Sequence, residues 1–152
     1  MLALNDLVAF AEAHVISRVN LEKQITVAED DEVSKLIMDL SNANNLCTLI
    51  VVVPSHDANL PDEDTRQMSN NLMFFVVKKY DSKAGNQKKL DNFNTCQLEV
   101  NALLNKILDL KGNGENNCLF SDVDLGSMPI TPVSNYFNQN GYLLQLSTRT
   151  DF

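Results

Sequence analysis

The sequence holds few side chains that could carry out chemistry, and their spacing argues against a catalytic centre. Its two histidines are His14 and His56. His56 stands in a Ser55-His56-Asp57 run, which contains the residue types of a hydrolase triad. Adjacent side chains cannot align as nucleophile, base and orienting acid, because a triad is assembled from separate segments of a fold. His14 falls on the apolar stripe of an expected helix and is interpreted as a packed structural residue. We therefore predict no catalytic residue.

The potential metal ligands are also scattered. The three cysteines, Cys47, Cys96 and Cys118, form no C-x-x-C pair, whereas structural zinc sites use ligands about two to four residues apart. Their wide spacing favours free structural thiols in a reducing compartment. The run Asp122-x-Asp124-x-Gly126 begins like a calcium loop, but a glycine occupies the third ligand position and the closing glutamate is missing. We therefore expect neither a metal nor a cofactor.

The positions of the charged residues are more informative than their sum. The chain has 12 Lys and Arg against 20 Asp and Glu, a formal net charge of −8. This acidic balance argues against general binding of nucleic acid. Residues 78–89, however, carry a local charge of +4. Their basic residues are Lys78, Lys79, Lys83, Lys88 and Lys89. An acidic loop is predicted over residues 54–69, and its acids are Asp57, Asp62, Glu63 and Asp64.

The elements that must position these charges are a hairpin and a long helix. Residues 46–53 are almost continuously apolar and rich in β-branched side chains, which predicts a central strand that ends at Pro54. Residues 72–80 predict a second strand, antiparallel to the first. An apolar stripe predicts a helix over residues 87–111. The acidic loop and the lysines then lie at opposite ends of the second strand.

Weaker patterns flank this core. Helices are predicted at residues 5–17 and 31–40, and strands at 24–28, 118–125, 128–133 and 142–148. Asn140-Gly141 is expected to form a turn with positive φ. No apolar run approaches the length of a membrane-spanning helix.

Together these patterns predict one α+β domain over residues 1–152. An acidic helical segment, residues 1–40, precedes a core of sheet and helix over residues 46–149. The sheet is expected to be antiparallel and four-stranded, built from the long-looped hairpin and the C-terminal strands. The long helix crosses one face, and the other helices are N-terminal.

A hairpin with a basic end and an acidic end suits head-to-tail pairing of identical copies, and such an interface makes a ring when it closes. Unpatterned surface charge is the plain alternative. A phosphate-binding patch is a third interpretation, weakened by the acidic balance and by a single nearby aromatic, Tyr80.

The order of elements resembles the tail-completion or tail-terminator class of tailed-phage neck proteins. In that class a helix precedes a long-looped hairpin, a helix across the sheet, and closing strands with a Pro-containing link and a Gly-aromatic step. The matching pieces are residues 5–17, 46–80, 87–111 and 117–149, with Pro129-Ile130-Thr131-Pro132 as the link and Asn140-Gly141-Tyr142 as the step. The acidic helix at 31–40 departs from the simplest members.

This resemblance implies a non-enzymatic virion protein that forms a ring in the phage neck, the head-tail connector between portal and tail. Its partners would be copies of itself in a cyclic homo-oligomer, and portal, adaptor or tail proteins. It would bind no membrane and no specific nucleic acid. It would be assembled in the host cytoplasm and located in the virion. The alternative is a small cytoplasmic binding or regulatory module without catalysis.

Overall fold

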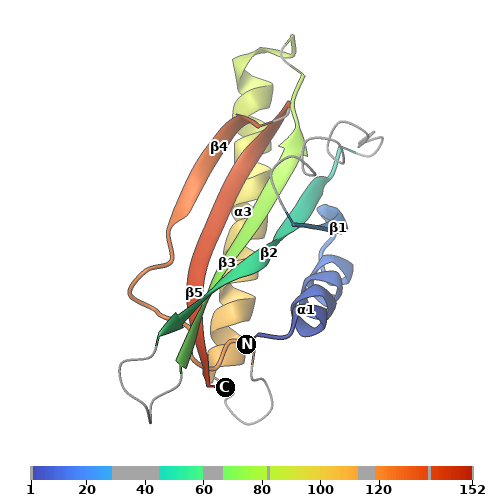
Figure 1. Ribbon diagram of the computed structural model, residues 1–152. Helices are drawn as coiled ribbons and strands as arrows, with labels where there is room; N and C mark the ends of the chain where they lie inside the picture. The colour runs from blue at the N-terminus through green and yellow to red at the C-terminus, as the bar shows by residue number, and fades with distance from the viewer. Residues whose placement is uncertain are drawn as a thin grey trace.

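The computed structural model describes residues 2–28, 45–59, 67–81, 83–112, 119–136 and 138–151. Within these residues, two helices and a five-stranded sheet form an α+β arrangement, in which α3 lies behind the sheet and α1 lies beside it in the view of Figure 1. The elements in chain order are α1 (Leu4–Ile16), β1 (Leu21–Val27), β2 (Cys47–Asn59), β3 (Gln67–Lys79), α3 (Gly85–Gly112), β4 (Ile130–Tyr136) and β5 (Gln139–Asp151). The helix predicted at residues 31–40 lies outside the described residues.

The strand order is β1-β2-β3-β5-β4. Strands β2, β3, β5 and β4 pair antiparallel with their neighbours, whereas β1 pairs parallel to β2. The predicted four-stranded antiparallel sheet is therefore corrected to a mixed sheet of five strands. Parallel neighbours require a long crossover connection, and residues 28–46 separate β1 from β2 in the sequence.

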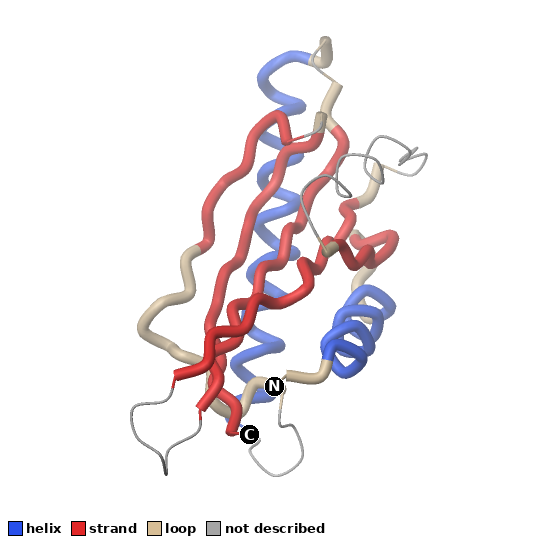
Figure 2. Tube along the Cα trace, viewed as in Figure 1, coloured by secondary structure: helices blue, strands red, loops and turns tan. Residues whose placement is uncertain are grey.

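The three central strands and α3 have matched lengths. Strands β2, β3 and β5 have 13 residues each, and α3 has 28. At standard rises per residue, such a strand is about 43 Å long and such a helix about 42 Å. Figure 2 shows α3 running along the strands over most of the length of the sheet. The helix α3 therefore covers one face of the sheet from near one end of the β2–β3 hairpin to near the other.

Pro54 does not end β2, contrary to the prediction. The strand continues to Asn59, and its register shifts after Val52, so that Val53 and Pro54 together face Leu72 of β3. A bulge of this kind removes a proline from the hydrogen-bonded ladder. Strand β1 pairs with β2 only as far as Val52, so the bulge lies where one side of β2 has no partner strand among the described residues.

The strand predicted at residues 118–125 is wrong over its described part. Residues 119–122 form turns, and Val123 makes a single bridge to Thr148. The apolar residues in this segment, Leu119 and Phe120, are buried in the main core instead. The apolar character of these two residues therefore indicates that they are buried. It does not indicate that the backbone forms a strand.

The expected turn at Asn140-Gly141 is also wrong. The positive φ occurs at Asn138 (60°), while Asn140 and Gly141 belong to β5. Gly141 is required for a different reason, because a Cβ there would lie 1.9 Å from the carbonyl oxygen of Val76 on the adjacent strand. A side chain is excluded at this position because two backbones approach closely there. The reason is not a positive φ.

The main core lies between the sheet and both helices. Alternate residues of β3 supply one side of it, and α3 and α1 supply the other. The contributors include Leu72, Phe74 and Val76 of β3, Val100, Leu103 and Ile107 of α3, and Leu7, Ala11 and Val15 of α1. The predicted apolar stripe of the long helix is thus confirmed over its C-terminal half, whereas Leu90 near its start is 48% exposed.

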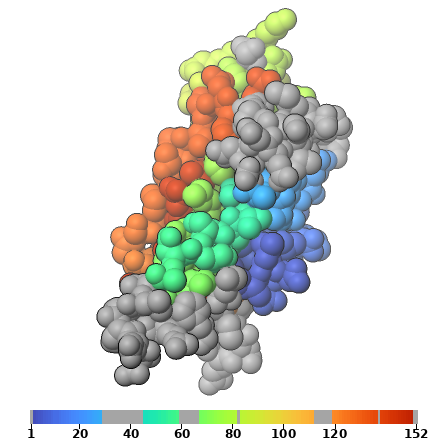
Figure 3. Space-filling view, in the orientation of Figure 1, coloured from blue at the N-terminus to red at the C-terminus, as the bar shows by residue number. Residues whose placement is uncertain are grey.

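The opposite face of the sheet, seen in Figure 3, carries a smaller apolar cluster. Its buried members are Val27, Ile50, Phe75 and Val77. Tyr136 of β4 stacks on Phe75 with a centroid distance of 5.2 Å. In the part of the chain that the structure describes, neither helix has the length and apolar character needed to cross a membrane.

We expect Gly141→Ala to lower the free energy of unfolding by about 3 kcal/mol, because its Cβ would collide with backbone held in the β3–β5 ladder. Urea denaturation measures the loss. The matched control is Gly126→Ala, whose Cβ would meet the end of the Asp124 side chain at 3.1 Å. We expect it to cost less than about 1 kcal/mol, and equal losses in the two variants would contradict the backbone explanation.

Candidate functional site

The acidic end of the hairpin places Asp57 on the regular backbone of β2, where it is exposed. Asn71 Nδ2 on β3 donates hydrogen bonds to Asp57 Oδ2 at 3.2 Å and to Ser55 Oγ at 3.4 Å. His56 instead bonds through Nδ1 to Oδ1 of buried Asn70, at 2.7 Å. Strand alternation therefore puts His56 on the face opposite Ser55 and Asp57, which is a geometric reason against a triad here.

The remaining acids predicted for this end are Asp62, Glu63 and Asp64, and they lie outside the described residues.

The basic end is formed by the last residues of β3 and the first turns of α3, and it brings together the five predicted lysines. They are not equivalent. Lys79, Lys83 and Lys88 are exposed. Lys89 is half-buried, with its Nζ 5.9 Å from the centroid of the Tyr80 ring, within cation–π range. Lys78, by contrast, is only 7% exposed.

Strand alternation explains the burial of Lys78. On β3, the residues that face α3 are Leu72, Phe74 and Val76. Lys78 is the next residue of the same row, because side chains two apart in a strand share a face. Lys79 points to the other side and is exposed. Sequence reasoning grouped the two lysines by charge, whereas the strand separates them by face.

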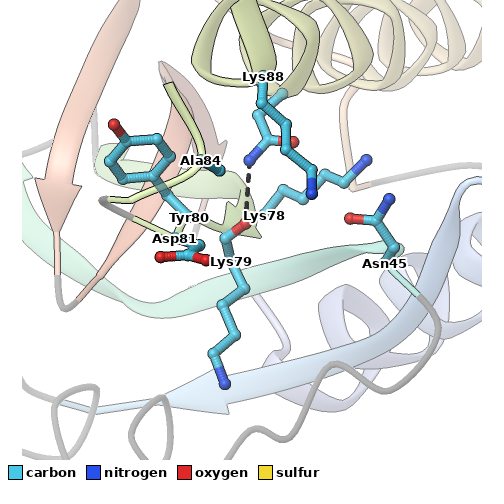
Figure 4. A pocket seen from close by; sticks show the side chains of 8 residues that line it. Asn45, Lys78, Lys79, Tyr80, Asp81, Ala84 and Lys88 are labelled. Carbon is cyan, nitrogen blue, oxygen red and sulfur yellow. Dashed lines mark hydrogen bonds between the residues drawn. The ribbon is translucent and has the colours of Figure 1, made fainter. Parts of the chain in front are cut away.

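A cavity of about 190 Å³ lies beside Lys78, and its lining includes Lys88 and Asn45. Figure 4 shows the side chains of Lys78 and Lys88 extending toward the side where Asn45 lies, while the side chain of Lys79 extends down the picture, away from their ammonium groups. Asn92 of α3 also lines the cavity, and its Nδ2 donates to the carbonyl oxygen of Lys79 at 2.9 Å. That bond fixes the start of α3 against the end of β3.

Asp81 is the acidic residue of this lining. Its Oδ1 accepts a hydrogen bond from the backbone N–H of Lys83 at 2.9 Å. In Figure 4 its carboxylate lies away from the ammonium groups of Lys78 and Lys88. Asp81 therefore organises the turn that precedes α3.

A second buried charge, Glu99 of α3, has a full set of partners. Its side chain is 0% exposed, and it accepts hydrogen bonds from Arg18 Nε at 2.7 Å, Arg18 Nη2 at 3.1 Å and Asn20 Nδ2 at 2.9 Å. Burial by itself raises the pKa of Glu99, but the hydrogen bonds from Arg18 and Asn20 and the charge of Arg18 outweigh it and lower the pKa. This pair attaches the segment between α1 and β1 to α3.

Lys78 differs from Glu99 in this respect. Its Nζ makes no hydrogen bond and no ion pair with any residue that the structure describes. Of these two buried charges, Glu99 is therefore structural, and Lys78 is the one directed at a cavity.

Cys47 and Cys96 lie next to this end as buried free thiols, with 3.6 Å between their Sγ atoms. Free thiols are thus confirmed for these two cysteines, and Cys118 lies outside the described residues. The contact with Cys47 and burial raise the pKa of Cys96, whose Sγ also donates to the carbonyl oxygen of Asn140 at 3.6 Å. The same contact lowers the pKa of Cys47, and both thiols are buried in the core.

His14 is buried, as expected for a packed structural histidine, and its ring lies 6.4 Å from that of Phe10. Burial, aided by the charge of Arg18, lowers the pKa of His14, so the neutral form is favoured. Among the described residues, no three His, Cys, Asp or Glu side chains gather closely enough to hold a metal ion.

The chain matches no protein-family model, and no curated protein matches it. Its functional interpretation rests on the residues and contacts themselves. Sequence reasoning located the lysines of the basic end but missed Asn45 and Asn92, the Arg18–Glu99 pair and the Cys47–Cys96 contact. Each of these joins positions that are distant in the sequence, and no local pattern signals such a contact.

We expect Arg18→Met to lower the free energy of unfolding at neutral pH by about 2 kcal/mol, because Glu99 would stay buried without its cation. This is below the loss of about 3–5 kcal/mol for a fully buried pair, because the Arg18 side chain is 35% exposed and solvent screens the interaction. Urea denaturation of exposed Arg149→Met provides the matched control, for which we expect a change within about 0.5 kcal/mol.

The pH dependence follows from the lowered pKa of Glu99. The stability that Glu99 contributes is present above the pKa of an unfolded glutamate and is lost as the pH falls through the lower folded value. The difference between the native chain and Arg18→Met should therefore shrink as the pH falls below about 4. A second substitution, Glu99→Gln, should recover part of the loss in the Arg18→Met background. A pH-independent difference, or no recovery, would contradict this role.

Proposed function

We propose that the protein is a non-enzymatic structural component of a phage virion, forming a ring in the neck, or head-tail connector, between portal and tail. It acts by self-association and by docking on adjacent rings of portal, adaptor or tail proteins. The observation that carries this proposal is the separation of opposite charges by the β2–β3 hairpin. Exposed Lys79, Lys83 and Lys88 lie at one end, and exposed Asp57 lies toward the other.

The hairpin is suited to hold these ends apart. Strands β2 and β3 pair antiparallel from Thr48↔Val77 to Asn59↔Gln67, and β3 is paired with β5 along its other side. Both neighbours make β3 a stiff spacer of about 43 Å. A basic end and an acidic end at this spacing favour head-to-tail contact between identical copies. When the same contact and rotation relate each copy to the next, the copies can close into a ring.

The order of the described elements also supports the proposal. Apart from β1, which lies between α1 and the hairpin, a helix, a long hairpin, a helix across the sheet and two closing strands follow one another, in the order of the tail-terminator class. On the sheet face opposite α3, partly buried Val52, Val133 and Leu143 offer a neighbouring copy apolar surface to cover. Charge would then direct the encounter, and apolar burial would hold the contact.

The alternative function, a small binding or regulatory module of the cytoplasm, is favoured by one observation. A cavity of about 190 Å³ lies beside Lys78 and Lys88, and a ring contact based on exposed charge does not require it.

Charge reversal at the basic end tests the ring. We expect Lys79→Glu combined with Lys83→Glu to weaken self-association at least tenfold at low salt, because the reversed end repels the acidic end of the next copy. Light scattering on size-separated protein, at about 0.05 M and 0.5 M salt, measures the oligomer and its screening. Lys78 is left unchanged, because a buried glutamate there would disturb the fold.

Two controls make this test specific. Lys106→Glu reverses an exposed lysine of α3 outside the basic end and should leave association unchanged. Adding Asp62→Lys and Asp64→Lys to the reversed variant should restore association, because the two ends again attract. A native chain that stays monomeric at every salt concentration, also beside portal and tail proteins, would contradict the ring. Association that ignores the reversal would contradict its charged ends.

A further inference from the structure

The cavity at the basic end has an unbalanced positive charge. The row of β3 side chains facing α3 ends in a polar residue on each side of its apolar centre, Asn70 and Lys78, and both are buried. Asn70 Nδ2 donates to the carbonyl oxygen of Thr148 and to Thr150 Oγ1, each at 3.1 Å. Lys78 has no such partner among the described residues, and its side chain extends into the cavity (Figure 4). The position therefore offers a donor to an acceptor that the described residues do not supply.

The surroundings of Lys78 increase the positive potential. Lys88, which lies one turn into α3, extends toward the same part of the cavity. The first turn of α3 contains no acidic residue to offset the partial positive charge of a helix N-terminus. The acid of the lining, Asp81, is bonded to the backbone of Lys83 and lies on the other side. Two ammonium groups therefore face one space without an opposing carboxylate among the described lining residues.

Size and donor chemistry define what fits. A volume of about 190 Å³ corresponds to about six water molecules, which is enough for a phosphate ion with part of its hydration. Lysine ammonium groups bind phosphate as point charges that each offer several N–H donors. The amide of Asn45 adds a neutral donor on the same side. A dianion of tetrahedral shape matches both the charge and the direction of these groups.

We propose that this cavity is a binding site for a phosphate-type oxyanion, held by Lys78, Lys88 and Asn45. Its ligand is inorganic phosphate or the terminal phosphoryl group of a small phosphate monoester. The site does not depend on ring formation, since its binding groups belong to one copy of the chain.

Phosphate titration followed by two-dimensional NMR of backbone amides tests the site. Phosphate replaces chloride at a constant ionic strength of about 0.15 M, so that general screening does not change. We expect saturable chemical-shift changes at Asn45, Lys78 and Lys88. Inorganic phosphate and glycerol phosphate are titrated separately, and the ligand that gives these changes, one or both, identifies the source of the phosphoryl group. Acetate at equal concentration should give a response at least tenfold weaker.

Two variants and a matched control link the response to the cavity. Lys78→Met keeps the apolar stem of the side chain and should weaken phosphate binding at least tenfold. Lys88→Met, at an exposed position that tolerates substitution, should weaken it similarly. Lys79 also contributes to the lining of the cavity, but its side chain extends away from the ammonium groups of Lys78 and Lys88. Lys79→Met should therefore change binding less than twofold. Thermal unfolding with and without phosphate gives an independent readout for each variant.

Three results of the phosphate titrations would overturn the site. They are shifts that never saturate with phosphate, equal responses to phosphate and acetate, and equal losses in Lys78→Met and Lys79→Met. Binding of a short DNA duplex without any response to phosphate would also overturn it, because it would indicate a surface that follows a nucleic-acid backbone.

Discussion

The pairing of β3 along its full length is the constraint on which the rest of the structure depends. All residues from Gln67 to Lys79 have a partner on β5, and β2 pairs along the opposite side. Because side chains alternate along a strand, each β3 side chain points either toward α3 or away from it. Its length sets the span that α3 must cover, and its ends become the two ends of the molecule at which charge gathers. Burial of Phe74, exposure of Lys79 and exclusion of a side chain at Gly141 all follow from it.

Several buried polar groups at the edges of the core have hydrogen-bond partners within the fold. Asn70 at one end of the β3 row is bonded to β5, and Glu99 in the middle of α3 is bonded to Arg18 and Asn20. Buried polar groups in folded proteins have partners with few exceptions. Some buried polar atoms among the described residues also lack a partner, including Thr48 Oγ1, Gln139 Oε1 and Asn140 Nδ2. Lys78 differs from these neutral groups because its ammonium group is charged, faces a cavity and has a second lysine beside it. Because the described residues supply no acceptor at this place, we propose one that comes from solution.

The two proposals meet at the basic end of the hairpin. The proposed ring contact uses exposed Lys79, Lys83 and Lys88, and the proposed oxyanion site uses Lys78 and Lys88. The two proposals therefore share Lys88 and the same local excess of positive charge. An oxyanion bound between Lys78 and Lys88 would reduce the potential that attracts the acidic end of another copy. Ligand occupancy and assembly are therefore expected to oppose each other, even though neither contact needs the other to form.

The sequence by itself determined the local elements and the clustering of charge. The sequence predicted the apolar runs that form β2 and β3, the apolar stripe of α3 and the group of lysines around residue 80. Such features can be predicted because periods of two and 3.6 residues are local properties of a sequence. The tertiary structure alone decided the parallel β1, the bulge at Pro54, the position of the turn before β5 and the pairing of Arg18 with Glu99. It also decided that Lys78 is buried while Lys79 is exposed. These features depend on strand register and on which sheet face meets a helix, and both are set by contacts between residues far apart in the chain.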